Sequence, residues 1–580
     1  MKRKYFLCLV IGILSILLLV CIQFVNSQSG IYINVAGQKI SLWQQDGKYY
    51  AFLPSACKDA GLEPKIPRQI DNSSVTLMYS ENIPAVFIDT QSGTIENINN
   101  DKNIKETGRI TVLEPDGSIS YLDSFDYIKG RGNTSYNEFD KKPYQLKLNE
   151  ATSFLGMEVG EKWIFTANAS DSTLLRNALS RNLANHLGLQ QSDEGVFVDL
   201  YMNGEYVGNY YVTEKVEVAT NRLEITDLEQ ATEKANDGTG LISFEAAWTD
   251  KTKSKRIPND PEDISGGYLI ERDFHSRFIE EVEINGSYFI TQNEECFIVR
   301  SPEYTSENQI AYINNYVQSV ENAILSTDGI DINTGKYYDE LIDVNSFVRK
   351  YLLEEITLNY DGGVASSFFY KDADSINGKL FAGPIWDYDV TWGNNPSFLG
   401  YLPTTPNRLT KLQYHSDSTT WFSALYNKPE FYKEIISCYK YEISPYLETL
   451  ANQILPELAE TTAASAAMDQ IRWKQQYIIN DPDFHSREKS ITFVSDYILN
   501  RKSFLDKAWI DEVPVYEINL ILNDVVYDVL YIFKGNSLPE FPEVHNDHAD
   551  VSHWVRVGYN ITPDKVNAVY EDMTFEAVVE

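Results

Sequence analysis

The sequence has few cysteine, histidine and basic residues for a chain of 580 residues. Its five cysteines include no Cys-x-x-Cys pair, which excludes zinc ribbons and thioredoxin-like redox sites. Cys8 and Cys21 lie in an apolar N-terminal run, so the remaining Cys57, Cys296 and Cys438 form at most one disulfide. His-Glu-x-x-His and Gly-x-Ser-x-Gly are both absent, which argues against zinc peptidases and serine hydrolases.

Positive charge is also scarce, because 49 Lys and Arg stand against 84 Asp and Glu, a formal charge of -35. Such a surface repels nucleic acid and anionic lipid, whose binding needs clustered basic residues. We therefore expect no nucleic-acid partner. The 43% hydrophobic and 13% aromatic content is ample for a packed core and argues against global disorder.

A long apolar run occurs at the N-terminus, from Phe6 to Val25, shortly after a Lys-Arg-Lys triplet. A helix of that length spans a bilayer core of roughly 30 Å. We interpret residues 1–29 as a signal-anchor helix, with a cleaved signal peptide as the alternative. The basic flank then stays inside, which predicts an extracytoplasmic protein, membrane-anchored or secreted. Contact with the membrane is expected through this segment only.

Strand patterns fill the first part of the remaining chain. Residues 30–80 alternate between apolar and polar residues and are expected to form a small β module, and similar stretches continue beyond it. The first helix is expected over residues 170–189, with Ser170 or Asp171 as its N-cap. Two strands joined by the Asn203-Gly204 turn follow.

Helical patterns dominate the second part. Residues 229–263 are polar and are interpreted as a loop insertion, and helices are expected between 306 and 508, interrupted by one β hairpin. From Val513 the composition changes back to strands, which predicts a separate small β domain over residues 513–580. The fold class is therefore α+β, with a central domain over residues 81–510 between two small β modules.

The stretch YIKGRGNTSYNEFDKKPYQLKL, residues 127–148, combines a Gly-x-Gly turn with lysines. Gly130 and Gly132 leave the backbone free to approach a ligand, and N–H groups in such a turn can face phosphate oxygens. Lys142 and Lys147 follow, and Lys147 lies on a predicted strand. A Gly-rich hairpin followed by a strand lysine is how kinases cover the phosphates of ATP. A plain tight turn is the structural alternative.

Acidic residues occur in two loops on either side of the predicted hairpin. Asp361, in LNYDGG, is either an Asx-turn residue or a catalytic base that accepts a hydroxyl proton. Asp387 and Asp389, in FAGPIWDYDVTWGN, either hold a metal ion or cap a turn, since an unpaired charge in an apolar stretch is costly to desolvate. Because both loops are expected at one end of the hairpin, their carboxylates come within reach of one Mg²⁺.

Two further positions complete this kinase-like plan. Ser366 stands where the plan places a second metal ligand after the catalytic base, and serine is a poorer ligand than asparagine. Glu214, in YYVTEKVE, ends the second strand of its hairpin, where a kinase hinge would bind adenine. A salt-bridged surface strand is the alternative interpretation of that segment.

Five stretches together resemble motifs of the CotH family, the spore-coat protein H kinases, and they occur in the family's order: YIKGRGNTSY, KKPYQLKL, KWIFTANASDSTLLRNALSRNLANHLGL, VDLYMNGEYVGNYYVTEKVE and PIWDYDVTWGN. The resemblance extends from about Ile83 to Trp392. It implies an atypical protein-kinase-like bilobal fold, with a β-rich N-lobe and a helical C-lobe. It also implies transfer of the ATP γ-phosphate to Ser or Thr of a surface or extracellular protein, with Mg²⁺ or Mn²⁺. The C-terminal domain resembles β-grasp repeats of Gram-positive surface proteins.

The resemblance also implies roles for individual residues. Asp361 aligns with the catalytic-loop aspartate and Asp387 with the metal-binding aspartate, while Asp389 is a second ligand or a structural partner. Arg176 occupies a family position to which the sequence assigns no role. Family members commonly have asparagine where Ser366 stands, so the second metal site departs from the family pattern. The candidates for phosphate contacts are Arg131, Lys142 and Lys147.

Two other functions stay open at this point. A catalytically weak or inactive surface scaffold or adhesin fits the membrane segment, the flanking β modules and the acidic surface. A metal-dependent hydrolase fits the paired acids, since metal-bound carboxylate sites can activate water.

Overall fold

The computed structural model describes residues 32–67, 75–191, 193–239, 257–273, 275, 278, 287–363, 365–394, 402–405, 421–473, 486–542, 544–546 and 549–579. The predicted signal-anchor therefore lies outside the described residues. Within these ranges, no helix combines the length and apolar character needed to cross a membrane. The described cysteines, Cys57, Cys296 and Cys438, are free thiols.

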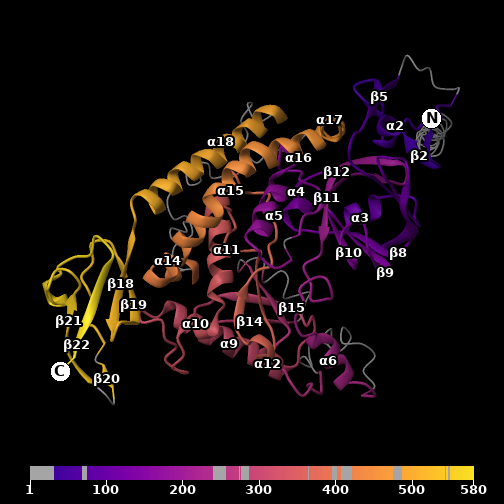
Figure 1. Ribbon diagram of the computed structural model, residues 1–580. Helices are drawn as coiled ribbons and strands as arrows, with labels where there is room; N and C mark the ends of the chain where they lie inside the picture. Colours follow the sequence, from indigo (N-terminus) through magenta and orange to yellow (C-terminus); the bar gives the residue numbers. More distant parts are fainter. Residues whose placement is uncertain are drawn as a thin grey trace, which may run out of the picture. The chain divides into compact units, whose positions relative to one another are not determined.

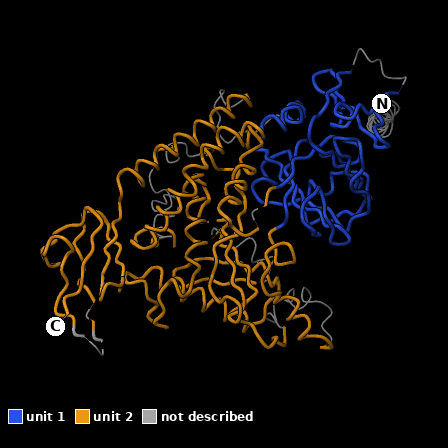
Figure 2. Tube along the Cα trace, in the orientation of Figure 1, with its two compact units in different colours: residues 1–170, 195–215, 458–477 blue, residues 171–194, 216–457, 478–580 orange. Residues whose placement is uncertain are grey.

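The chain divides into two compact units (Figure 2). Unit 1 comprises Met1–Ser170, Gly195–Lys215 and Leu458–Tyr477, and unit 2 comprises Asp171–Glu194, Val216–Glu457 and Ile478–Glu580. Strands dominate unit 1 and helices with two sheets make up unit 2 (Figure 1). The expected mixture of strands and helices is thus confirmed.

Unit 1 is built around a closed β barrel whose described strands follow the order β10-β12-β11-β6-β7-β8-β9. Alternate side chains fill its interior, among them Leu146, Leu148 and Trp163. The predicted Asn203-Gly204 turn is confirmed, with both residues at positive φ (51° and 84°). The elements are β6 (Ala85–Thr90), α3 (Glu96–Asn100), β7 (Glu106–Leu113), β8 (Ile119–Gly130), α4 (Thr134–Glu138), β9 (Tyr144–Thr152), β10 (Gly160–Thr166), β11 (Val196–Met202) and β12 (Glu205–Glu214).

The expected N-terminal β module covers the outer face of this barrel. Its strands form two small sheets, β1-β2 and β3-β4-β5. Phe52 packs against Tyr206 of the barrel, with ring centroids 4.8 Å apart, and Met468 completes the same apolar cluster. The elements are β1 (Tyr32–Val35), β2 (Gln38–Ser41), β3 (Trp43–Gln45), β4 (Lys48–Leu53), α2 (Ala56–Asp59) and β5 (Val75–Tyr79).

A helix from late in the sequence, α17 (Ala463–Arg472), packs on β12 within unit 1 through buried polar groups. Lys141 Nζ lies 2.7 Å from Asp469 Oδ1 and donates to the carbonyl of Asn209. The Ser465 hydroxyl donates to Asp199 Oδ1 over 2.6 Å. Burial raises the pKa of Asp199 to about 6. The carboxylates of Asp199 and Asp469 and the ammonium group of Lys141 thus lie together in a buried contact. This burial favours the neutral form of Asp199.

In unit 2, the first helix is shorter than the predicted 170–189. It begins at Arg176 as α5 (Arg176–His186), because the Asp171 carboxylate accepts hydrogen bonds from the Thr173 and Arg176 amides and holds the preceding residues in a turn. The predicted insertion also contains a helix, α6 (Leu228–Ala235), whose N-cap Asp227 accepts from the Gln230 amide.

An antiparallel sheet with the order β14-β15-β13-β16-β17 carries the predicted hairpin, β16–β17. The rings of Phe347 and Trp421 pack against the ring of Phe369 in this sheet, with ring centroids 5.7 and 5.2 Å away. The strands are β13 (Tyr268–Arg272), β14 (Tyr288–Ile290), β15 (Cys296–Ser301), β16 (Ser367–Lys371) and β17 (Leu380–Ala382). The helices before and within the hairpin are α9 (Glu307–Leu325), α10 (Tyr338–Leu341), α11 (Val344–Thr357) and α12 (Asp374–Asn377).

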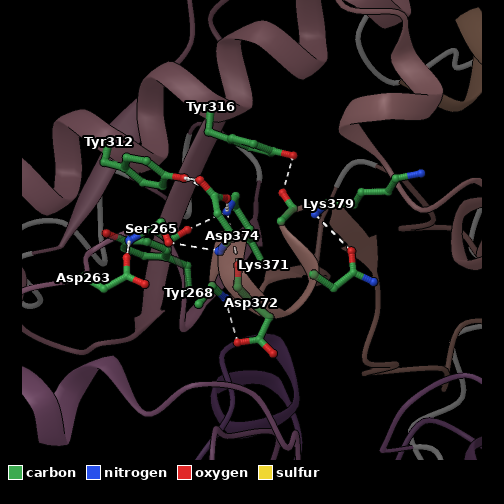
Figure 3. Close-up of polar contacts among 12 residues, drawn as sticks. Asp263, Ser265, Tyr268, Tyr312, Tyr316, Lys371, Asp372, Asp374 and Lys379 are labelled. Atoms are coloured by element: carbon green, nitrogen blue, oxygen red, sulfur yellow. Dashed lines mark hydrogen bonds and ion pairs between the residues drawn. The ribbon is translucent and has the colours of Figure 1, made fainter.

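One end of the β16–β17 hairpin is held by Lys371, shown in Figure 3. Its ammonium group donates to Asp374 (2.6 Å) and to the carbonyl of Ser265 (2.5 Å). It also lies 4.6 and 5.4 Å from the ring centroids of Tyr316 and Tyr312 on α9. These contacts use the charge of a fully buried lysine and fix the turn of the hairpin to α9.

The remaining helices and the C-terminal sheet follow. The helical pattern expected up to residue 508 is confirmed by α13 (Trp421–Tyr426), α14 (Pro429–Cys438), η3 (Tyr439–Ile443), α15 (Ser444–Thr449), η4 (Leu450–Ile454), α16 (Leu455–Thr461), α18 (Arg487–Leu505) and η6 (Asp506–Asp511). The C-terminal residues form a sheet with the order β19-β18-β22-β21-β20, in which β18 and β22 are parallel. Its elements are β18 (Val515–Leu522), β19 (Val525–Phe533), β20 (His545–Asn546), β21 (Ala549–Arg556), η7 (Pro563–Lys565) and β22 (Met573–Val579). Their kinship with surface-protein repeats stays a prediction.

The buried Asp199 predicts a pH-dependent stability for unit 1. Its pKa is raised from 3.8 to about 6 in the folded chain, so the folded state binds the proton more tightly than the unfolded state. The free energy of unfolding should therefore fall by about 3 kcal/mol as pH rises from about 4 to about 6, and change little above. Asp199→Asn should remove that fall, as measured by urea unfolding across this pH range.

The control is Asp123→Asn, which changes an exposed aspartate of β8 in the same unit. It should leave the pH profile of the parent intact. An Asp199→Asn variant whose profile matches that of the control would show that folding does not raise the pKa of Asp199.

Candidate active site

The two acidic loops lie side by side in unit 2, as predicted. The Tyr360 amide donates to the carbonyl of Val390 over 3.3 Å, and the Trp392 amide donates to that of Thr357, the last residue of α11 before the first loop, over 2.9 Å. The first loop follows α11 and leads into β16, while the second leaves β17. The two acid-bearing segments are therefore joined by backbone hydrogen bonds, in addition to the hairpin that connects them along the chain.

Asp361 lies just beyond the C-terminus of α11. That helix ends in Leu358, which adopts a left-handed conformation with φ of 48°. The Asn359 side chain accepts a hydrogen bond from the Asp361 amide (3.2 Å), so the Asx turn expected here belongs to Asn359. The carbonyl of Asp361 accepts from the Ala365 amide (3.0 Å). Asp361 is buried in this tightly turned loop.

Two neighbours of that loop were not found from the sequence. Arg272, at the end of β13, donates to the carbonyl of Gly363 and forms an ion pair with Glu295. Gly362 lies against Glu354 of α11, where an added Cβ would stand 2.7 Å from Glu354 Oε2. Only glycine fits at this point without a shift of that buried carboxylate.

Asp387 and Asp389 flank a buried tyrosine, Tyr388. Asp387 is exposed and has a left-handed backbone with φ of 64°, a conformation that Asp tolerates better than most residues. Asp389 is half-buried, and its carbonyl accepts from the Asn394 side chain (2.8 Å). The two carboxylates therefore have different surroundings, and Asp387 is the more accessible to a ligand.

Three polar side chains of helix α5 form hydrogen bonds with this segment. Arg176 Nε donates to the carbonyl of Thr391 (3.0 Å), and Asn177 Oδ1 accepts from the Tyr388 amide (2.9 Å). The hydroxyl of Ser180 accepts from the indole of Trp392 (3.0 Å). Arg176, whose role the sequence left open, thus positions the Asp387 segment.

Ser366 precedes β16 and is buried, with a left-handed φ of 49°. Asparagine adopts this conformation more readily than serine. The backbone here thus suits the residue that the family commonly has at this position. Ser366 and Asp361 belong to the same short loop.

The Gly-rich stretch belongs to unit 1, where Gly130 ends β8 and the following residues turn into α4, which precedes β9. Gly130 has no room for a side chain, since a Cβ would stand 2.3 Å from the ring of Tyr136, and Gly132 needs its positive φ of 88°. The Arg131 amide donates to the carbonyl of Pro143 (3.1 Å). The turn is therefore well explained by packing, and its predicted contact with phosphate stays a prediction.

The other candidates of unit 1 are engaged in local contacts. Lys142 donates to the carbonyl of Tyr136 (2.5 Å). Lys147 lies on the outer face of β9 and pairs with Asp126 (2.9 Å), which raises its pKa. Glu214 is buried at the end of β12, and the chain passes from unit 1 to unit 2 after Lys215. The hinge role of this segment and its adenine contact both stay predictions.

The donor set of the acidic loops fits one class of cation. Among the described residues, no group of three or more His, Cys, Asp and Glu side chains is placed to hold a metal ion. Mg²⁺ typically binds through one or two carboxylates together with substrate phosphates and waters. The accessible Asp387, with Asp389 beside it, offers ligands of that kind.

The model of the CotH kinase protein family matches residues 128–505, more than half of the chain. The chain belongs to this family. No curated protein matches the chain in a sequence comparison. The match includes the Gly-rich stretch, α5, Asp361 and the Asp387 segment. The CotH family is a family of kinase-like proteins, which agrees with the resemblance noted in the sequence.

The ion pair between Arg176 and Asp171 predicts a large effect on stability. Both side chains are fully buried, so Arg176→Met removes the charge that pairs directly with a buried carboxylate. We expect the free energy of unfolding to fall by about 3–5 kcal/mol, measured by urea denaturation. The matched control is Arg349→Met, whose pair with Glu442 is partly exposed and should contribute about 1 kcal/mol or less. Equal losses in the two variants would contradict the positioning role of Arg176.

Proposed function

We propose that this CotH-family protein is an exported kinase that transfers the ATP γ-phosphate to Ser or Thr of a surface or extracellular protein. The observation that carries the proposal is the pair of acidic loops joined by backbone hydrogen bonds, in a chain that the family model matches over both loops. Phosphoryl transfer needs mainly positioned groups and a metal ion, rather than a covalent intermediate. A loop aspartate beside a metal-binding aspartate supplies those groups.

The proposed roles follow the positions of the residues. Asp361 accepts the proton of the attacking hydroxyl group, since it is a buried carboxylate on a rigid loop. Asp387 binds Mg²⁺ or Mn²⁺ together with ATP phosphates, and Asp389 is either a second ligand or a support. Ser366 contributes a weaker second metal contact. When bound, the cation neutralises charge that develops on the phosphoryl group.

The nucleotide contacts are assigned to unit 1. In the proposed bilobal arrangement unit 1 is the N-lobe and the greater part of unit 2 is the C-lobe. The Gly130–Gly132 turn covers the phosphates, and the segment at Glu214 is the hinge beside adenine. Arg131, Lys142 and Lys147 are the proposed phosphate contacts, and Lys142 and Lys147 would exchange their present partners for phosphate oxygens.

The proposed export is inferred from the N-terminal residues. A basic triplet before the apolar run of residues 6–25 supports a signal-anchor or a cleaved signal peptide. The protein substrate would then be met on the cell surface or outside the cell. The formal charge of -35 supports a role without nucleic acid.

Substitution of the two acids should separate chemistry from binding. Asp361→Asn should lower phosphate transfer by about 100-fold or more and keep the thermal shift produced by ATP with Mn²⁺, because only the base is lost. Asp387→Asn should lose both, because it removes a metal ligand. Transfer is measured with labelled ATP and surface proteins of the source cell, and binding by thermal denaturation.

Asp528→Asn, in the exposed strand β19, is the control and should behave as the parent. Absence of any shift for the parent at millimolar ATP with Mg²⁺ or Mn²⁺ would overturn the kinase proposal and support the inactive scaffold. Unchanged transfer by both acidic variants would show that the site is elsewhere.

Ser366→Asn should strengthen the second metal contact. The left-handed backbone at this position accommodates asparagine, whose carbonyl oxygen is a better ligand than a hydroxyl group. We expect the Mn²⁺ concentration for half-maximal transfer to fall by about tenfold, which corresponds to about 1.4 kcal/mol. Ser366→Ala is the control and should raise that concentration or leave it unchanged. If the asparagine and alanine variants respond alike, Ser366 does not face the metal.

A further inference from the structure

Tyr388 is the fixed point of the Asp387–Asp389 segment. Its amide donates to the side chain of Asn177, and its carbonyl accepts from the hydroxyl of Thr391 (2.6 Å). The ring is buried, with 2% of the residue exposed. Since every backbone polar group of Tyr388 is bonded, the two flanking acids have little freedom to move independently of it.

The hydroxyl of Tyr388 enters a buried ion pair on α11. It donates to Glu354 Oε1 over 2.6 Å and accepts from Lys350 Nζ over 2.7 Å. Lys350 and Glu354 are one helical turn apart, 2.6 Å from each other, and each is 1% exposed. A buried ion pair is often no more stabilising than apolar side chains of the same volume. Its presence here is better explained by the geometry that it imposes on Tyr388.

The second oxygen of the same carboxylate faces the other acidic loop. Glu354 Oε2 is buried and has no hydrogen-bond partner among the residues that the structure describes. It lies against Gly362, directly after Asp361, as the contact with an added Cβ shows. One carboxylate of α11 therefore touches Tyr388, next to Asp387, through one oxygen and the Asp361 loop through the other.

We propose that Lys350, Glu354 and Tyr388 form a positioning unit that sets the spacing of Asp361 and Asp387, and thereby the affinity for a divalent cation bound with nucleotide. Mg²⁺ requires near-ideal octahedral geometry at about 2.0–2.1 Å, so a small displacement of a ligand weakens binding. The effect on the cation rests on the proposed function. The coupling of the two loops does not, because it is a property of the folded chain.

Tyr388→Phe removes the hydroxyl group and leaves the ring and the Lys350–Glu354 pair in place. The matched control is Tyr351→Phe on the same helix. Tyr351 is fully buried, and its hydroxyl has no hydrogen-bond partner within the described ranges, so its loss breaks no bond. Glu354→Gln is a second variant that keeps the shape of the side chain and removes its charge.

The first measurement is amide hydrogen exchange of the full chain without ligand. The Tyr360 and Trp392 amides cross between the two loops and should lose protection together in Tyr388→Phe, by about tenfold, the effect of losing one hydrogen bond to a charged group. Glu354→Gln should act in the same direction. Tyr351→Phe should exchange as the parent does.

The second measurement is calorimetric titration with ATP and Mn²⁺, well below the unfolding temperature of every variant. Tyr388→Phe should raise the dissociation constant by about tenfold, and Tyr351→Phe should leave it unchanged. Equal exchange in the two tyrosine variants would overturn the coupling. If Tyr388→Phe loses amide protection but keeps the dissociation constant of the parent, the positioning unit does not set the affinity for the cation. A parent that binds no ATP with Mn²⁺ would overturn the proposed function, while exchange still decides the coupling.

Discussion

The candidate site depends on two backbone hydrogen bonds, from Tyr360 to Val390 and from Trp392 to Thr357. They hold two loops that have no regular structure of their own. Leu358 and Trp392 both adopt a left-handed backbone, with φ of 48° and 51°, which is unusual for bulky side chains. Such residues cost roughly 1–3 kcal/mol each and persist only where their surroundings determine them. Here the surroundings are the helices α5 and α11, which contact the two loops.

Local patterns were sufficient to predict the elements around the site, but not the contacts that shape it. The Asn203-Gly204 turn and the β16–β17 hairpin depend on neighbouring residues, so the sequence reveals them. The start of α5 depends on a carboxylate, Asp171, that binds the side chain and amide of Arg176 and so delays the helix. A capping rule applied to Asp171 places the helix too early, because the rule considers only the nearest amides.

The acids of the site were found because their context is unusual, with Asp361 among glycines and Asp387 among aromatic residues. Their adjacency followed from the hairpin between them. The buried charged residues of α11 that support these acids were not predicted, and the reason is physical. Glu354 and Glu355 are consecutive in α11, and charged neighbours in a helix normally indicate a solvated face. In the structure both are buried, one paired with Lys350 and the other with Arg501. Those partners are recognised only once the chain is folded.

The burial of basic residues also affects how ATP, the proposed phosphate donor, would reach the site. The chain has 49 Lys and Arg against 84 Asp and Glu, and several of the bases are buried as counter-ions, including Lys141, Lys350 and Arg501. The bases left at the surface are fewer than the composition indicates. A free nucleotide carries several negative charges and is repelled by such a surface, whereas a nucleotide with a bound divalent cation is repelled less. In the proposed function, the cation would then serve in the approach of ATP as well as in its binding at Asp387. Under the same proposal, the hydrogen bonds from buried groups of α5 and α11 would hold Asp387 in place, so that a site of few ligands could bind the cation.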